Sequence, residues 1–141
     1  MTTLNATTRP IGPRERLRAT RRNLLLWTLQ GWLAMFFVAS GYAKLTEPVE
    51  NLALLFSWAG AMSAGFVRGV GLVEVVSGFA LLAPLLSWRL GRAPLLGAAA
   101  LLAAMALIMS VVHGMRFEVG AAVTNLALFA FAATVVRGRS R

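Results

Sequence analysis

The sequence lacks cysteine altogether and contains a single histidine. Without cysteine the chain has no disulfide, no thiol redox pair, no iron–sulfur cluster and no cysteine zinc site. This excludes the four-helix membrane enzymes that shuttle dithiols. One histidine would require a dimer for a bis-histidine haem, and it offers too few ligands for a structural metal site. We therefore expect no metal centre and do not favour a haem.

Charged side chains are also scarce. They make up 13% of the 141 residues, whereas hydrophobic residues make up 58%, and this balance excludes a water-soluble monomer. About half of the charged residues lie in two short stretches, residues 9–22 and 137–141. The middle of the chain is therefore suited to lipid, and its length is that of a single domain.

Four long apolar runs fill this middle part. About 20 helical residues, at a rise of ~1.5 Å each, cross the ~30 Å hydrocarbon core of a bilayer. Each run therefore predicts a membrane-spanning helix, and Pro94 is suited to the start of the third because its missing N–H is not needed there. The predicted spans are residues 23–43, 69–87, 95–113 and 119–136.

The predicted fold is all-α, a polytopic membrane four-helix bundle formed by residues 23–136. A basic N-terminal tail, residues 1–22, precedes the bundle, and a basic C-terminal tail, residues 137–141, follows it. Between the first two spans, residues 48–64 include an apolar stretch of ~12 residues, which is too short to cross a bilayer. We expect a short interfacial or re-entrant helix there. No internal repeat is visible, so an inverted-repeat transporter has no support.

Lysine and arginine are concentrated on one side of the predicted bundle. The two tails and the connection between the second and third spans, with Arg89 and Arg92, hold most of them. Positively charged flanks remain in the cytoplasm, so we expect a bacterial inner-membrane protein with both termini on the cytoplasmic side. An even number of spans agrees with this orientation. The alternative is that the first apolar run belongs to a secretory signal peptide, but the basic leader and the run are both long for one.

The formal net charge of +9 raises the question of nucleic acid binding. No aromatic residue is interleaved with the arginines of the N-terminal tail, although base stacking would require this. We therefore expect no nucleic acid partner. Anionic lipid headgroups account better for the charge, so the lipid bilayer is the expected partner, and a homo-oligomer is left open.

A small set of polar residues is predicted to share one depth in the outer half of the bundle. Glu74 and Asn125 each lie about 9 Å along a span that enters from the outer side, at ~1.5 Å per residue, so their side chains could touch. Lys44 and His113 lie near the outer ends of the first and third spans. A charged group in lipid costs at least ~2.5 kcal/mol, which makes such residues functional candidates. We expect no comparable polar set in the inner half.

These residue types indicate a site that moves protons and orients a ligand. Glu74 and His113 are the candidate catalytic residues, because a partly desolvated carboxylate and an imidazole can exchange a proton. Lys44 and Asn125 are the candidate cofactor-binding residues, since an ammonium group can hold a negative oxygen and an amide can orient a carbonyl. The alternative is structural: hydrogen bonds or an ion pair between helices, or solvated side chains at the interface.

Short motifs in the order of the spans resemble those of a known family. The first span ends in GYAKL, residues 41–45, the second contains GLVEVVSG, residues 71–78, His113 closes the third and Asn125 lies in the fourth. With the short apolar segment after the first span, this order resembles the DoxX-like family of small four-helix bacterial membrane proteins over about residues 30–137. The four polar candidates occupy the positions of the family's polar motif.

The resemblance implies a link to redox chemistry. The family is similar to the membrane subunit of an archaeal thiosulfate:quinone oxidoreductase, and some members are linked to membrane oxidoreductase complexes in oxidative-stress defence. The leading hypothesis is therefore a membrane subunit of a quinone-linked oxidoreductase, with a quinone as the candidate cofactor. We expect no soluble domain in this chain, so a soluble or membrane oxidoreductase partner would supply the electrons. Whether the chain is itself catalytic stays open.

Two other functional classes remain open on the sequence. The first is a small, dimeric proton-coupled transporter, because small four-helix exporters also carry a single membrane glutamate. They usually carry it in the first span, whereas Glu74 lies in the second. The second class is a non-catalytic assembly factor that escorts other membrane proteins.

Overall fold

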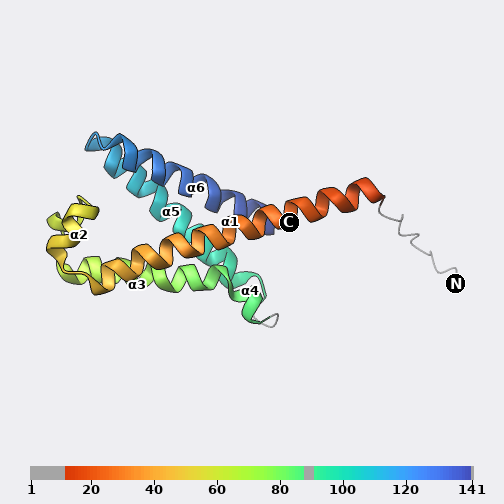
Figure 1. The fold of residues 1–141 in the computed structure, drawn as a ribbon, viewed down its shortest axis with the longest axis horizontal. Helices are drawn as coiled ribbons and strands as arrows, with labels where there is room; N and C mark the ends of the chain where they lie inside the picture. The colour runs from red at the N-terminus through yellow and green to blue at the C-terminus, as the bar shows by residue number, and fades with distance from the viewer. Residues whose placement is uncertain (1–11, 88–90, 141) are drawn as a thin grey trace, which may run out of the picture.

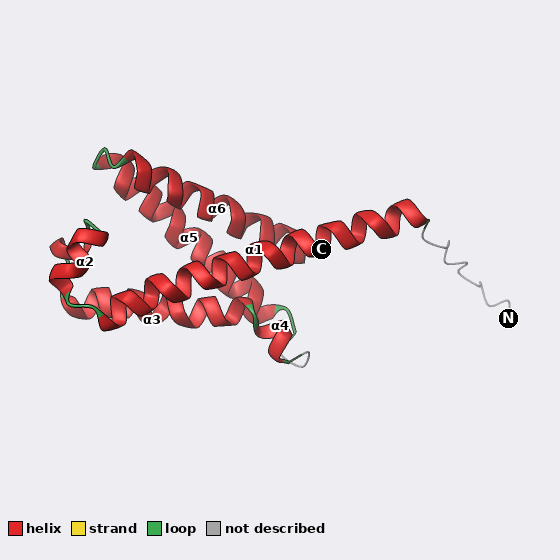
Figure 2. Ribbon diagram, viewed as in Figure 1, coloured by secondary structure: helices red, strands yellow, loops and turns green. Residues whose placement is uncertain are grey.

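A computed structural model describes residues 12–87 and 91–140, and within these residues it contains helices and no strand (Figures 1 and 2). Four helices are long and apolar enough to cross a membrane. They are α1 (Pro13–Thr46), α3 (Ala64–Leu81), α5 (Ala93–Met115) and α6 (Val119–Ser140). The predicted all-α polytopic bundle is confirmed.

Three short elements connect the long helices. They are α2 (Val49–Leu55), the 3₁₀ helix η1 (Ala59–Ala61) and α4 (Ala83–Leu86). The first two fall within the segment where a short interfacial or re-entrant helix was expected, which confirms that part of the fold. We call residues 49–61 the cap, and the end of the bundle where they lie the cap end (Figure 1).

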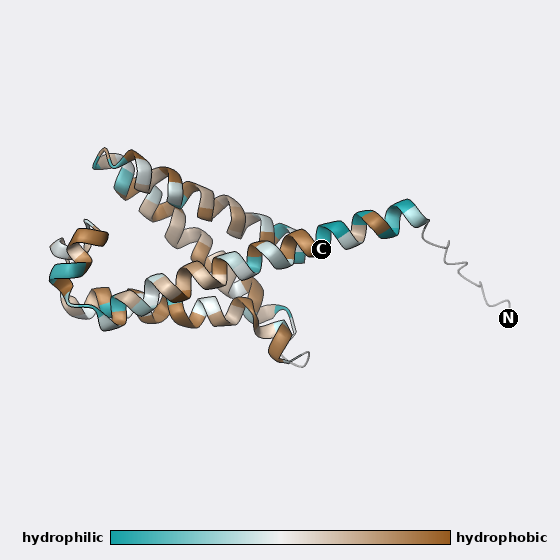
Figure 3. Cartoon of the chain, viewed as in Figure 1, coloured by the Kyte–Doolittle hydropathy of each residue, from teal (hydrophilic) through white to brown (hydrophobic). Residues whose placement is uncertain are grey.

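Helix α1 begins far ahead of the predicted first span. Gly12 is its N-cap and Pro13 its first residue, a position where proline is favoured. Its 34 residues measure ~51 Å at ~1.5 Å each, more than the ~30 Å hydrocarbon core. The first turns therefore project beyond the bundle as a hydrophilic extension (Figures 1 and 3). Residues 1–11 of the expected N-terminal tail lie outside the described residues.

The second predicted span differs from helix α3 at both ends. The helix starts at Ala64, where the Ser63 hydroxyl accepts a hydrogen bond from the Phe66 amide at 3.3 Å, as N-cap serines do. It ends at Leu81 because Pro84 cannot donate a backbone hydrogen bond and its ring clashes with the preceding turn. The remaining apolar residues form α4. Arg89 of the expected basic connection lies outside the described residues.

The four long helices pack as two pairs. Helix α1 lies along α3 and α5 lies along α6, while contacts of α3 with α5 and of α1 with α6 join the pairs. Arg139 Nη1 donates to Asn23 Oδ1 at 2.8 Å, which places the end of α6 beside α1. We call this end of the bundle the terminal end. It lies opposite the cap end (Figure 1).

Apolar side chains fill the centre of the bundle and also cover its outside. The largest buried cluster takes residues from the four long helices, among them Leu33, Leu81, Leu102 and Val135. Many large apolar side chains are exposed on the outer surface of the helices. Such a surface fits a lipid bilayer, where apolar contact with lipid tails is favourable.

Glycines allow α1 and α3 to approach closely. A Cβ atom at Gly41 would lie 2.5 Å from the Gly71 carbonyl oxygen, and one at Gly71 would lie 2.8 Å from the Gly41 carbonyl oxygen and 2.8 Å from Lys44 Cβ. Farther along, a Cβ at Gly78 would lie 2.6 Å from Val38. Small residues at crossing points are typical of membrane helices, where packing drives association.

We predict that Gly71→Ala destabilises the bundle, because the added methyl group would overlap the backbone of α1. Overpacking costs about 1–3 kcal/mol, so the thermal unfolding midpoint in detergent, followed by circular dichroism, should fall. Gly69→Ala in the same helix is the control, since nothing lies within 4 Å of a Cβ there, and alanine favours a helix by up to about 1 kcal/mol. Equal midpoints for the two variants would contradict the close crossing.

Candidate functional site

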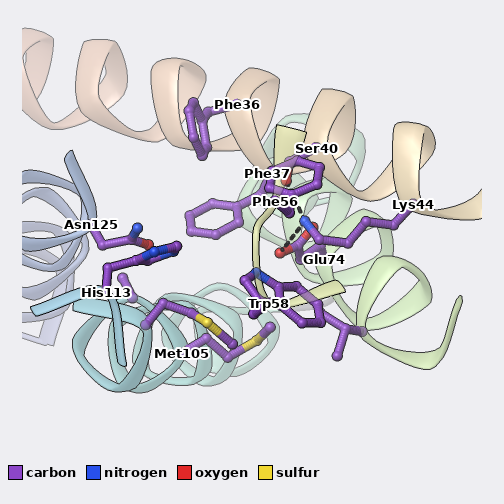
Figure 4. Close-up of a pocket in the computed structure, with 13 residues that line it drawn as sticks. Phe36, Phe37, Ser40, Lys44, Phe56, Trp58, Glu74, Met105, His113 and Asn125 are labelled. Carbon is purple, nitrogen blue, oxygen red and sulfur yellow. Dashed lines mark hydrogen bonds and ion pairs between the residues drawn. The ribbon is translucent and has the colours of Figure 1, made fainter. Parts of the chain in front are cut away.

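One narrow cavity near the cap end gathers the four polar residues singled out from the sequence. Lys44 of α1, Glu74 of α3, His113 of α5 and Asn125 of α6 all line it (Figure 4), and its volume is about 70 Å³. The other lining residues are mostly aromatic, methionine or small side chains: Phe36, Phe37, Ser40, Phe56, Trp58, Val70, Met105, Ala106 and Met109.

Lys44 and Glu74 form a buried ion pair. Lys44 Nζ donates to Glu74 Oε2 at 2.8 Å and to Oε1 at 3.1 Å, and it donates to Ser40 Oγ at 2.6 Å. The two side chains are only 3% and 8% exposed. The ammonium group also lies 4.1 Å from the centre of the Phe56 ring in the cap, a favourable cation–π distance. All three ammonium protons thus have partners within the described residues.

The crossing of α1 and α3 brings this pair together. Gly41 and Gly71 let the two backbones meet at the level of the pair, so Lys44 reaches Glu74 directly across the contact. The Arg68 guanidinium donates to the Lys44 carbonyl oxygen, one of the last carbonyls of α1, which have no partner within the helix. Glu74 therefore pairs with Lys44, and not with Asn125 as the equal depths indicated.

His113 pairs with Glu118, a residue to which the sequence analysis assigned no role. The distance from His113 Nδ1 to Glu118 Oε2 is 2.5 Å. The same carboxylate accepts hydrogen bonds from Ser57 Oγ at 2.8 Å and from Arg116 Nε at 3.0 Å. Since Ser57 lies in the cap, Glu118 connects the cap to the turn between α5 and α6. We call the bond from Ser57 to Glu118 the latch.

An unusual turn places Glu118 beside the histidine. Phe117 has a φ of 58°, in the left-handed region that glycine usually occupies. The Glu118 amide donates to the His113 carbonyl at 2.9 Å and the Phe117 amide to the Gly114 carbonyl at 3.1 Å. This pair of bonds is the Schellman motif that ends many helices, and it folds the chain back onto the last turn of α5.

Hydrogen bonding lowers the pKa of Glu118 to about 2. The donor at His113 is the main cause, followed by the Ser57 hydroxyl, because hydrogen bonds to the charged form of a carboxyl group favour ionisation. Glu118 lies between α5 and α6, outside the membrane-spanning helices. The carboxylate that holds the cap is therefore ionised at neutral pH.

Asn125 lies on the histidine side of the cavity, away from the ion pair (Figure 4). Its Nδ2 donates to the Ala121 carbonyl of its own helix at 2.9 Å, a local bond of the kind that polar side chains make in membrane helices. The polar groups of the cavity thus form two sets, Lys44 with Glu74 on one side and His113 with Asn125 on the other.

Comparison with known protein families shows which family the chain belongs to. The model of the DoxX-like family matches residues 28–135, which include most of α1 and α6, the whole of α3 and α5, and the cap. The chain belongs to the DoxX-like family. No match was found among curated proteins or among solved structures. The resemblance seen in the sequence motifs is therefore confirmed.

The DoxX-like cavity is too small for a quinone ring in this conformation. Ligand pockets usually measure ~300–1,000 Å³, whereas this cavity measures about 70 Å³, room for a few water molecules at ~30 Å³ each. The ammonium group that was expected to hold a ligand oxygen is already bound by Glu74 and Ser40. The lining side chains suit a ring with polar edges, but the cavity is too small to hold one. The geometry of this conformation therefore supports no redox step.

The expectation that the inner half of this DoxX-like bundle lacks a comparable polar set was wrong. Gln30 is fully buried; its Nε2 donates to the Leu81 carbonyl at 3.1 Å, and its Oε1 accepts from Arg139 Nε at 2.6 Å. Arg139 also donates to Asn23. A glutamine inside an apolar run is the sequence feature that indicates this set. Gln30 carries no charge, so the cost of placing a charge in lipid does not single it out, and Arg139 belongs to the expected basic C-terminal tail.

We predict that breaking the ion pair on one side is more harmful than removing both charges. Lys44→Met leaves a buried carboxylate and Glu74→Leu a buried ammonium, and such changes typically cost about 3–5 kcal/mol. The double variant leaves no buried charge, so it should regain much of the lost stability. Unfolding of all four proteins by denaturant in mixed micelles gives the double-mutant cycle. Additive losses would contradict a direct coupling between the two residues.

The latch should weaken at low pH. A carboxylate whose pKa is depressed in the folded state stabilises that state above its unfolded pKa and loses this contribution as the pH falls through the folded value. For Glu118 the window runs from about 4.5 down to about 2. In a protein that keeps Trp58 as its only tryptophan, fluorescence should report loosening of the cap in this window.

Two variants separate the latch from general acid effects. Glu118→Gln should abolish the transition, because the titrating group is gone. Glu50→Gln removes an exposed acid on the cap itself and should leave the transition in place. A transition that persists unchanged in Glu118→Gln would show that Glu118 does not hold the cap.

Proposed function

We propose that this protein is a gated ligand-binding subunit of a membrane oxidoreductase system, and that the cavity under the cap is its ligand site. One observation carries the proposal: four membrane helices each deliver a polar residue to the same cavity. Polar and ionisable groups inside a membrane are costly and are usually retained for function. The oxidoreductase link rests on the family resemblance, and electrons would come from a partner protein.

The walls of the cavity support a planar ring as the ligand class. Phe36, Phe37, Met105 and Met109 line it, and aromatic and methionine side chains adapt well to flat apolar groups. Polar groups at two sides would then face oxygens at the ring edge. A quinone head group has this shape and chemistry, and it would enter only after the cap moves.

The cap is the part that can move without unfolding the bundle. It consists of two short helical elements, and its Leu52, Trp58 and Ala59 form a small buried cluster with Val67 of α3 that is separate from the main core. The latch adds one hydrogen bond to the α5–α6 turn. Short lids with few contacts are common gates of buried sites.

His113 is suited to pass protons between the cavity and the surface. Its side chain is 8% exposed, whereas its partner Glu118 is 29% exposed and Arg116, next to Glu118, is 45% exposed. An imidazole can accept a proton on one nitrogen and release one from the other. With Glu74 held by Lys44, the His113–Glu118 pair is the route by which a bound ligand would gain or lose a proton.

The direction of the bundle in the membrane is part of the proposal. The arginines at the terminal end favour the cytoplasmic side, so the cap end and its cavity would face the exterior of a bacterial plasma membrane. In this arrangement residues 23–136 form the membrane domain, and residues 1–22 and 137–141 form the basic cytoplasmic tails.

No observation favours the two alternative classes as strongly. A proton-coupled transporter needs a polar path between the two faces, whereas Leu33, Ala34 and Phe37, in the buried apolar cluster, separate Gln30 from the cavity along α1. For an assembly factor, the described residues offer no feature that a ligand site would not also explain. The ligand-binding function is therefore the one that we put to a test.

Binding of short-tailed benzoquinone and naphthoquinone analogues tests the proposal. With protein in lipid nanodiscs, quenching of Trp58 fluorescence should saturate, and empty nanodiscs correct for partitioning into lipid. Asn125→Leu should weaken binding by about three- to tenfold, the worth of one hydrogen bond. Glu118→Gln should speed association, because it replaces the ionised acceptor of the latch with a neutral amide oxygen, which holds the Ser57 hydroxyl less strongly.

Thr124→Val is the matched control for Asn125→Leu. Thr124 is the preceding residue, it is exposed, and its hydroxyl donates to the Gly120 carbonyl of its own helix, so its loss should leave affinity unchanged. Absence of saturable binding in both the unmodified protein and Glu118→Gln would overturn the ligand class. Equal effects of the two α6 variants would place the ligand elsewhere.

A further inference from the structure

Arg139 at the terminal end is a partly buried cation with no anionic partner among residues 12–87 and 91–140. Its Nε donates to Gln30 and its Nη1 to Asn23, both neutral amides, and its guanidinium lies 4.8 Å from the Trp27 ring centre. Its Nη2 is buried and has no hydrogen-bond partner within the described residues. A buried charged donor left without an acceptor is costly, so this nitrogen marks a place where an acceptor belongs.

Arg139 lines a cavity together with two other arginines. Arg22 of α1, Arg92 at the start of α5 and Arg139 of α6 line a space of about 260 Å³. Arg92 lies close to Arg139, since its Nη1 donates to the Arg139 carbonyl oxygen at 3.4 Å. Guanidinium groups from three helices around one space repel one another unless an anion lies between them.

A neighbouring groove connects this cavity to the lipid-facing surface. A space of about 490 Å³ shares Arg22, Leu26 and Gly138 with the arginine cavity and extends past Leu25 and Thr134. Leu25 is 55% exposed, so the groove between α1 and α6, which Arg137 also lines, offers apolar side chains directly beside the cations. A molecule with an anionic head and an apolar tail matches a cationic cavity that continues into this groove.

We infer that the arginine cavity binds the phosphate group of an anionic phospholipid, with an acyl chain along the groove between α1 and α6. Guanidinium groups bind phosphate through paired, charge-assisted hydrogen bonds, and Arg139 has one donor, Nη2, without a partner within the described residues. Basic pockets between membrane helices are known sites for phospholipid headgroups. The adjoining apolar groove is what favours a lipid over free phosphate. The site is separate from the cavity under the cap.

Native mass spectrometry of the delipidated full-length protein tests the inference. Phosphatidylglycerol, phosphatidylcholine and inorganic phosphate are titrated separately. The unmodified protein should bind one phosphatidylglycerol about tenfold more tightly than phosphatidylcholine. Arg139→Gln and Arg22→Gln should each remove this preference. Arg14→Gln, which deletes an exposed arginine of α1 that does not line the cavity, should keep it.

Arg139→Gln could disturb the fold, because Arg139 is hydrogen-bonded to Gln30 and Asn23. Arg22→Gln avoids this problem, since Arg22 takes no part in those hydrogen bonds. Equal affinities for the two lipids, or the same loss in Arg14→Gln as in Arg22→Gln, would overturn the site and leave only diffuse attraction between charges. Binding of inorganic phosphate that excludes phosphatidylglycerol, and is lost in Arg22→Gln, would overturn the lipid as the source of the phosphate.

Discussion

The close crossing of α1 and α3 is the constraint on which the cavity under the cap depends. An unpaired charge would not be tolerated at this depth, so Lys44 and Glu74 must meet within hydrogen-bonding distance. They meet because Gly41 and Gly71 remove the side chains that would separate the two backbones. Once the pair is formed, the cap can close over it through Phe56, and the remaining polar groups take the opposite side of the cavity.

The bundle has polar networks at both ends and an apolar centre between them. At the cap end the network is ionic and enclosed, with carboxylates matched to Lys44 and to His113. At the terminal end the network around Gln30 and Arg139 is hydrogen-bonded but carries an excess of positive charge within the described residues. The two ends thus differ in charge, and we propose a different ligand for each, a small polar-edged ring at one and an anionic headgroup at the other.

The sequence predicted the membrane helices, because runs of apolar residues of bilayer length leave few alternatives. It also predicted that four polar residues lie at one depth, and all four line the cavity, since depth along a helix follows from counting residues. It did not predict the partners. Which face of a helix meets which neighbour depends on rotation about the helix axis, so Glu74 was matched by depth to Asn125 when it contacts Lys44. Glu118 was missed because a left-handed phenylalanine, which no residue pattern indicates, turns the chain back to His113.

The position of Glu118 has a thermodynamic consequence. One carboxylate serves two neighbours that belong to different parts of the molecule, the imidazole in the wall of the cavity and the hydroxyl of the cap. Two equilibria that share one group are linked, and the linkage is reciprocal. A change in the bond between the carboxylate and the imidazole therefore changes how strongly the carboxylate holds the serine, and displacement of the serine changes the bond to the imidazole by the same free energy. The turn between α5 and α6 thus couples the cap directly to the wall of the cavity, and no longer pathway through the bundle is needed.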